Sequence, residues 1–394
     1  MATGGVRAAA LGLLLVAACA LRPQGAAAQR YNAIWSFGDS ISDTGNLCVG
    51  GCPSWLTTGQ SPYGETFFGR PTGRCSDGRV IVDFLGTYLT YTLRFDRHGR
   101  RRRLAGGDFK KGANMAIIGA TTMSADFFSL IGLSDKIWNN GPLDTQIQWF
   151  RQLLPSVCGS DCKSYLSKSL FVVGEFGGND YNAALFSGRS MAEVRGYVPR
   201  VVSKLIRGLE TIVRAGAVDV VVPGVLPIGC FPIYLTLYGT SNGGDYDGDG
   251  CLKSYNGLSS YHNALLRRSL ASLQRTYPHA RIMYADFYSQ VVHMIRAPQN
   301  FVSVITECEH GRLVAKPRGP RVSVHDRDRS KACVLMDGKY NYNNKARCGM
   351  AGAAACSDPG NYLIWDGIHL TEAAYKAIAD GWLKGPYCNP AIQH

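Results

Sequence analysis

Apolar residues gather in five short runs that alternate with longer segments of mixed polarity. The runs are rich in β-branched side chains, which is typical of buried strands. They cover residues 32–37, 114–118, 169–174, 217–222 and 280–285. Candidate helices cover residues 77–90, 143–154, 191–214, 252–277 and 370–383. Strands that alternate with helices predict an α/β fold with a parallel sheet and crossover helices.

The clearest candidate helix is the segment 191–214. Its apolar residues recur at spacings of three and four, which produces one face that can pack on a sheet. They are Val194, Val198, Val201, Leu205, Leu209 and Ile212. The chain has 394 residues, of which 46% are hydrophobic, and it contains no internal repeat or linker. We therefore predict a single domain over residues 29–394.

The N-terminus has the pattern of a secretory signal. Arg7 precedes the apolar run 8–21, and the alanines at 26–28 fit a signal-peptidase site. We predict a signal peptide over residues 1–28 and a mature chain in the secretory pathway that has no stable membrane insertion. An uncleaved signal anchor is the alternative, because a run of about 14 apolar residues is short for a spanning helix but can tilt or thin the bilayer.

Cysteine usage agrees with an oxidising compartment. Of the 13 cysteines, Cys19 lies in the predicted signal, so an even number remains and disulfides are expected. Cys48 with Cys52 and Cys158 with Cys162 are spaced to close local rings, while the pairing of the other cysteines stays open. Zinc requires four converging ligands in paired spacings, and no such set occurs, so we predict no metal.

The formal net charge of +13 favours acidic polymers or an anionic wall surface as partners over nucleic acid. Part of this charge lies in the basic run 97–103, which has no interleaved aromatic residues and no nucleic-acid motif. A solvated loop is the favoured interpretation, and a processing site is the alternative. Asp245, Asp247 and Asp249 match the opening of an EF-hand loop, but Asn256 replaces its final glutamate, so a hydrated turn is predicted.

A candidate nucleophile follows the first predicted strand, in the sequence Gly38-Asp39-Ser40. A serine on a glycine-containing turn just past a buried strand can present its hydroxyl beside backbone N–H groups. The alternative is an ordinary turn in which Asp39 and Ser40 only accept local backbone hydrogen bonds. This short motif alone leaves both interpretations open.

A candidate base precedes the last predicted helix. Asp366 and His369 are three residues apart across Gly367, so the carboxylate can reach the imidazole Nδ1–H and stabilise an imidazolium. A serine hydroxyl is a weak nucleophile that requires such a base.

Two other strand ends offer donors for a tetrahedral oxyanion, each worth about 3 to 4 kcal/mol. Gly119 follows the second strand, where the absent side chain lets a backbone N–H approach a carbonyl. Asn179 follows the third strand and can offer its amide N–H groups. Together with Ser40, Asp366 and His369 these residues provide every part that acyl transfer requires.

The blocks 37–46, 112–120, 177–181 and 366–369 resemble, in order, those of plant GDSL esterase/lipases in the SGNH hydrolase superfamily. The resemblance implies a three-layer α/β/α, flavodoxin-like fold with a central five-stranded parallel sheet. It also implies ester hydrolysis through a serine acyl-enzyme without a cofactor. The implied site residues are the nucleophile Ser40, the base His369, its partner Asp366, and the oxyanion donors Ser40, Gly119 and Asn179.

The stretches 62–84, 169–183 and 340–352 look like the subgroup that contains sinapine esterase, acetylajmalan esterase and grass arabinoxylan deacetylase. This similarity favours removal of acetyl or other small acyl groups from a carbohydrate or specialised metabolite. The predicted signal peptide favours secretion to the apoplast, with the Golgi or vacuole as alternatives. The alternatives are a lipase on longer acyl esters, an acyltransferase that uses the same acyl-enzyme, and a wall-polysaccharide binding protein that has lost catalysis. The complete set of site residues argues against the last.

Three features depart from the family pattern. Ile41 replaces the leucine of the family name, which is a tolerated change between aliphatic side chains. The basic run 97–103 is unlike the neutral segment expected there. Residues 302–338 are charged and poorly periodic, which is typical of disorder or of an error in the gene model, and this leaves the pairing of Cys308 and Cys333 open.

Overall fold

The computed structural model describes residues 31–89, 109–138, 141–301, 306–309, 312–315, 332–333 and 338–393. The predicted signal peptide 1–28, the basic run 97–103 and most of the segment 302–338 lie outside these residues.

The core of the molecule is a six-stranded sheet with the strand order β2-β1-β3-β4-β5-β8. Its strands are β1 (Ile34–Phe37), β2 (Gly112–Asn114), β3 (Leu170–Val173), β4 (Asp219–Pro223), β5 (Arg281–Ala285) and β8 (Cys388–Asn389). The first five run parallel, with Ile34 opposite both Gly112 and Leu170, and β8 pairs antiparallel with β5. The predicted α/β class is confirmed, and the short edge strand β8 adds to the five parallel strands expected.

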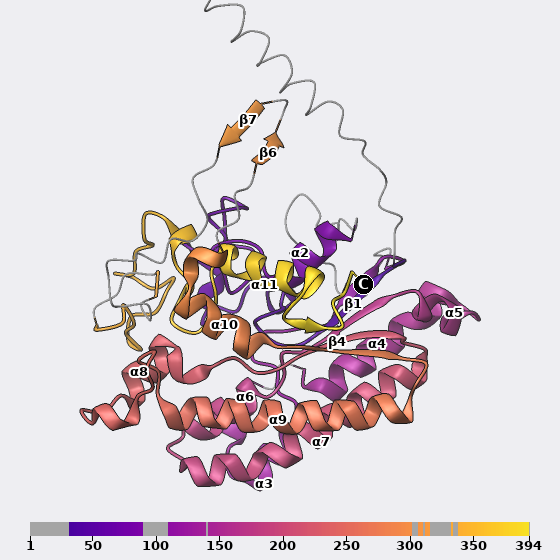
Figure 1. Cartoon of the computed structure of the whole chain (residues 1–394), viewed down its shortest axis with the longest axis horizontal. Coiled ribbons are helices and arrows are strands. Elements are labelled where there is room, and N and C mark those ends of the chain that lie inside the picture. Colours follow the sequence, from indigo (N-terminus) through magenta and orange to yellow (C-terminus); the bar gives the residue numbers. More distant parts are fainter. Residues whose placement is uncertain are drawn as a thin grey trace, which may run out of the picture.

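Helices cover both faces of this sheet. They are α2 (Ile81–Tyr88), α3 (Ala125–Leu130), α4 (Leu143–Cys158), α5 (Cys162–Ser167), α6 (Gly178–Leu185), α7 (Met191–Ala215), α8 (Pro232–Tyr238), α9 (Lys253–Thr276), α10 (Phe287–Arg296) and α11 (Glu372–Lys384). Figure 1 shows α4, α7 and α9 below the sheet and α2, α10 and α11 above it. Contacts within each group, such as α7 with α9 and α11 with α2, agree with these two layers.

Short 3-10 turns lie in the connections between these elements. They are η1 (Asn46–Cys48), η2 (Thr57–Gly59), η3 (Ser134–Lys136), η4 (Ile228–Cys230), η5 (Gly243–Asp245), η6 (Pro298–Phe301) and η7 (Pro359–Asn361). Within residues 302–338 the structure describes a separate antiparallel hairpin of β6 (Thr306–Glu309) and β7 (Arg312–Ala315). Among the described helices, none combines the length and apolarity that crossing a bilayer requires.

The apolar face predicted for residues 191–214 is the buried face of α7. All six of the apolar residues expected there are less than 1% exposed. Burial of a fully enclosed aliphatic side chain stabilises a fold by about 1.5 to 3 kcal/mol, so this face anchors one helical layer to the sheet.

Four disulfides are present among the described residues: Cys48–Cys52, Cys158–Cys162, Cys230–Cys251 and Cys333–Cys356. The first two are the local rings expected from their spacing. Cys75, Cys348 and Cys388 are buried thiols, so the expectation of disulfides is wrong for these three in this structure. The side chain of Cys308 lies outside the described residues, and Cys333 pairs with Cys356 instead.

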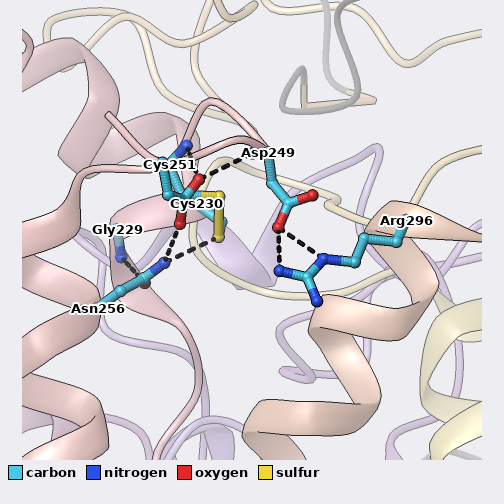
Figure 2. The surroundings of a disulfide bond; sticks show 7 residues. Gly229, Cys230, Asp249, Cys251, Asn256 and Arg296 are labelled. Atoms are coloured by element: carbon cyan, nitrogen blue, oxygen red, sulfur yellow. Dashed lines mark hydrogen bonds and ion pairs between the residues drawn. A yellow bond between two sulfur atoms is a disulfide. The ribbon is translucent and has the colours of Figure 1, made fainter. Parts of the chain in front are cut away.

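The Cys230–Cys251 disulfide joins η4 to the start of α9 (Figure 2). Asn256 of α9 accepts a hydrogen bond from the Gly229 N–H at 3.0 Å. This hydrogen bond and the disulfide both connect η4 to the N-terminal end of α9. In the neighbouring acidic loop, Asp247 accepts from the backbone N–H groups of Asp249 and Cys251. Asp249 pairs with Arg296 at 2.7 Å. The side chains of Asp247 and Arg296 therefore hold the acidic loop as a turn, in agreement with the predicted turn.

Candidate active site

The turn that carries Ser40 begins at Gly38, directly after β1. Gly38 has φ +150°, and a Cβ there would lie 3.0 Å from the Gly174 carbonyl oxygen, so glycine lets β1 and β3 approach closely. The side chain of Gln146 on α4 accepts from the Gly38 N–H at 2.9 Å and donates to the Gly38 carbonyl at 2.8 Å. This tether fixes the backbone two residues before Ser40.

Ser40, His369 and Asp366 form one hydrogen-bonded chain. His369 Nε2 lies 2.8 Å from Ser40 Oγ, and His369 Nδ1 lies 2.8 Å from Asp366 Oδ2. The other carboxylate oxygen of Asp366 accepts from the backbone N–H groups of Ile368 and His369 at 3.1 and 2.8 Å. A tight turn therefore orients the carboxylate toward the imidazole ring of the same segment.

Asp366 and His369 each shift the pKa of the other. Burial opposes ionisation of Asp366, but the charge and hydrogen bonds of His369 outweigh it and hold the pKa of Asp366 at about 2. Burial also disfavours a charged His369, yet the Asp366 carboxylate outweighs this and raises the pKa of His369 well above its ordinary 6.5. The arrangement strengthens the imidazole as a proton acceptor.

Tyr63 is a further member of this network that the sequence did not single out. It is buried, and its hydroxyl donates to Asp366 Oδ2 at 2.7 Å, the same oxygen that faces His369. Tyr63 and Asp366 are 303 residues apart, so no local pattern reveals the contact. The one available signal was that Tyr63 lies inside the stretch 62–84, which resembles the family.

Gly119 lies on a loop whose backbone is hydrogen-bonded to the side chain of Asp43. Gly119 has φ +79°, and the Ile118 N–H donates to Asp43 at 2.9 Å. Burial raises the pKa of Asp43 to about 6, although four backbone N–H groups lower it. Gly119 borders the same cavity as Ser40.

That second strand ends earlier than predicted. β2 covers Gly112–Asn114 instead of residues 114–118, because the chain leaves the sheet after Asn114. The Asn114 side chain donates to the Ser42 carbonyl at 2.6 Å, and the Ile117 N–H donates to the Gly38 carbonyl at 3.2 Å. The apolar residues after Asn114 therefore pack beside the serine turn.

Asn179 also borders the cavity, at the start of α6, but its amide is already engaged. It donates to Asp39 Oδ2 at 2.8 Å and to the Ala120 carbonyl at 3.0 Å. Burial raises the pKa of Asp39 to about 7. Burial and the nearby Asp39 also raise the pKa of Glu175 well above its ordinary value. The amide is thus held beside Ser40 by the buried Asp39 carboxyl group and the Ala120 carbonyl.

One cavity of about 290 Å³ contacts all five predicted site residues, Ser40, Gly119, Asn179, Asp366 and His369. It is also lined by polar side chains, including Thr57, Thr58 and Asn182, and by apolar ones such as Ile137, Trp138 and Ile233. A serine that is hydrogen-bonded to a His–Asp pair, on a cavity that Gly119 and Asn179 also line, can carry out acyl transfer on an ester or amide.

Comparison with known proteins agrees with this chemistry. The family model described as GDSL-like lipase/acylhydrolase matches residues 34–382. The chain belongs to the GDSL lipase/acylhydrolase family. It is 40% identical over 369 residues to the GDSL esterase/lipase At5g45910 of Arabidopsis thaliana, covering 92% of each chain. It is 39% identical to At1g28600 of the same plant, covering 91% of this chain and 86% of the relative.

Membership in the GDSL family makes this protein a plant-type serine ester hydrolase with the α/β fold described above. The predicted family resemblance is confirmed, and the subgroup remains a prediction. Within the described part of this GDSL protein, no group of three or more His, Cys, Asp and Glu side chains is placed to hold a metal ion.

Proposed function

We propose that the protein hydrolyses carboxylic esters through an acyl-enzyme on Ser40. His369 Nε2 takes the Ser40 proton as Oγ attacks the ester carbonyl carbon. His369 then returns this proton to the leaving alcohol oxygen, and the acyl group stays on Ser40. Water attacks the acyl carbon with His369 again as base, which releases the acid and restores the serine. Asp366 stabilises the transient imidazolium in both halves.

The backbone N–H groups of Ser40 and Gly119 and the side-chain amide of Asn179 stabilise the tetrahedral oxyanion in this proposal. Asn179 turns one N–H from Ala120 or Asp39 toward the oxyanion as negative charge develops there. Loss of one such donor typically slows turnover by about a hundredfold or more.

The size of the cavity favours an ester with a small acyl group and a compact alcohol. Its volume of about 290 Å³ lies at the lower end of the range for ligand pockets. Most of its lining is apolar, but side chains such as Thr57, Thr58 and Asn182 offer hydrogen bonds that a polar alcohol can use and a long hydrocarbon chain cannot. We therefore assign acetyl or another small acyl group on a carbohydrate or specialised metabolite as the substrate, which agrees with the resemblance to sinapine esterase, acetylajmalan esterase and arabinoxylan deacetylase.

The same proposal includes export and contact with acidic polymers. Four disulfides among the described residues support an oxidising compartment, and the N-terminal pattern supports secretion to the apoplast. The net charge of +13 supports attraction to anionic wall polymers, which weakens as salt increases.

The single observation that carries the proposal is the hydrogen-bonded chain from Asp366 through His369 to Ser40 on a cavity that also contains Gly119. Turnover of a chromogenic acetate ester tests it. Ser40→Ala should lower kcat by roughly a thousandfold or more without loss of folding.

Ser42→Ala is the matched control, because Ser42 is a buried serine two residues away whose hydroxyl reaches only the Gly174 carbonyl, at 3.4 Å. Its turnover should stay near that of the unaltered enzyme. Retained activity in Ser40→Ala would contradict the proposal and point to another nucleophile.

A further inference from the structure

Two tryptophans near the active-site cavity expose much of their surface. Trp55 is 51% exposed and Trp138 is 47% exposed. Their ring centroids lie 4.8 Å apart and their planes meet at 63°, so the indoles form an open corner. Exposed aromatic surface of this size is unfavourable in water, and adjacent exposed apolar groups mark ligand or partner sites.

This corner adjoins the reacting groups. Trp138 lines the cavity that contains Ser40 and His369. It also lies over Gly119, since a Cβ built on Gly119 would be 2.6 Å from Trp138 Cε3. Trp55 is followed directly by Leu56, Thr57 and Thr58, all of which line the same cavity. A ligand that leaves the cavity on this side therefore meets the two indoles.

We propose that Trp55 and Trp138 form a binding corner for a sugar ring in the alcohol portion of the ester. This inference rests on the proposed hydrolysis at Ser40 and names the class of substrate. A small acyl group fills little of a cavity of about 290 Å³, so most of that space accommodates the alcohol.

Polar side chains within the mostly apolar cavity favour a sugar over a hydrocarbon chain. Thr57, Thr121, Asn182, Ser187 and Arg347 line the cavity together with Trp138. A sugar ring presents C–H groups on one face, which pack on an indole, and hydroxyls at its edge, which pair with such side chains. A long acyl chain would take water from these polar groups and offer no hydrogen bonds in return, which is unfavourable.

The experiment compares kcat/KM for acetylated xylan oligomers with kcat/KM for ethyl acetate, measured by acid release. Trp55→Ala should lower the value for the oligomers by about tenfold and leave ethyl acetate nearly unchanged, because only the sugar reaches the indole. Trp138→Phe, which keeps a ring over Gly119, should lower the value for the oligomers by a smaller factor than Trp55→Ala.

Phe67→Ala is the matched control. Phe67 is 53% exposed, comparable to Trp55, and does not line the cavity, so its removal should affect neither substrate. If Trp55→Ala and the unaltered enzyme had the same kcat/KM for the oligomers, the proposed binding of a sugar ring at this corner would be wrong. Ethyl octanoate, an ester with a long acyl chain, is measured in parallel. If Trp55→Ala lowered kcat/KM for this ester alone, the two tryptophans would instead bind the acyl chain.

The unaltered enzyme separates failure of the corner from failure of the proposed function. Turnover of ethyl acetate without turnover of the oligomers would overturn only the sugar corner. No turnover of ethyl acetate would contradict ester hydrolysis at Ser40, and the corner with it.

Discussion

At the scale of single residues, the Tyr63 hydroxyl is hydrogen-bonded to Asp366, the proposed partner of the catalytic base. Its hydroxyl and the His369 imidazole share Asp366 Oδ2, at 2.7 and 2.8 Å. A donated hydrogen bond stabilises the carboxylate and lowers its basicity. Tyr63 therefore acts through Asp366 as a positioning residue and limits how tightly the carboxylate holds the proton of His369.

Tyr63→Phe tests this role through the pH dependence of turnover. His369 must be neutral to accept a proton, so kcat/KM falls as pH decreases through the raised pKa of His369. Loss of the hydroxyl makes Asp366 more basic, which raises the pKa of His369 further and moves this acidic limb to higher pH. We also expect kcat to fall by roughly tenfold with little change in KM.

A merely structural role for Tyr63 would lower stability and leave the acidic limb in place. Tyr197→Phe serves as the control, since the Tyr197 hydroxyl bonds to Glu193 on the exposed face of α7. Its profile should match that of the unaltered enzyme. An unmoved limb in Tyr63→Phe would contradict the assigned role.

At the scale of secondary structure, α4 positions the serine turn through one side chain. Gln146 is fully buried and satisfies both backbone groups of Gly38. Gln146→Leu would leave the buried Gly38 N–H without a partner, which costs about 1–3 kcal/mol, while the Gly38 carbonyl would keep its hydrogen bond from the Ile117 N–H. The free energy of unfolding should fall accordingly, as denaturant titration would measure.

Gln148→Leu provides the comparison, because Gln148 lies on the exposed face of the same helix. Its free energy of unfolding should change by less than about 0.5 kcal/mol. Equal stability of the two variants would show that the Gly38 tether contributes nothing.

The elements that the sequence predicts well are those whose pattern is local. The strands at 169–174 and 280–285 and the helix at 191–214 agree with β3, β5 and α7 within a few residues, since period and length decide them. The second strand was displaced because Asn114 and Ile117 form tertiary bonds to the serine turn. A local pattern does not contain such bonds.

At the scale of the whole molecule, segments more than 300 residues apart meet at the carboxyl edge of the sheet. Ser40 and His369 are 329 positions apart, and their separation in space is 2.8 Å. The sequence predicted this meeting because a serine just past a parallel strand requires a base, and Asp366 and His369 offer one ahead of the last helix. It could not predict the contributions of Gln146, Tyr63 or Trp138, which depend on how the layers pack around that edge.

Covalent labelling of the folded enzyme tests the Ser40–His369–Asp366 arrangement most directly. A fluorophosphonate, which reacts only with activated serines, should add one adduct, located at Ser40 by peptide mass spectrometry. His369→Ala should remain folded and label far more slowly. An adduct on another serine, or unchanged labelling in His369→Ala, would contradict the assignment of Ser40 as a nucleophile activated by His369.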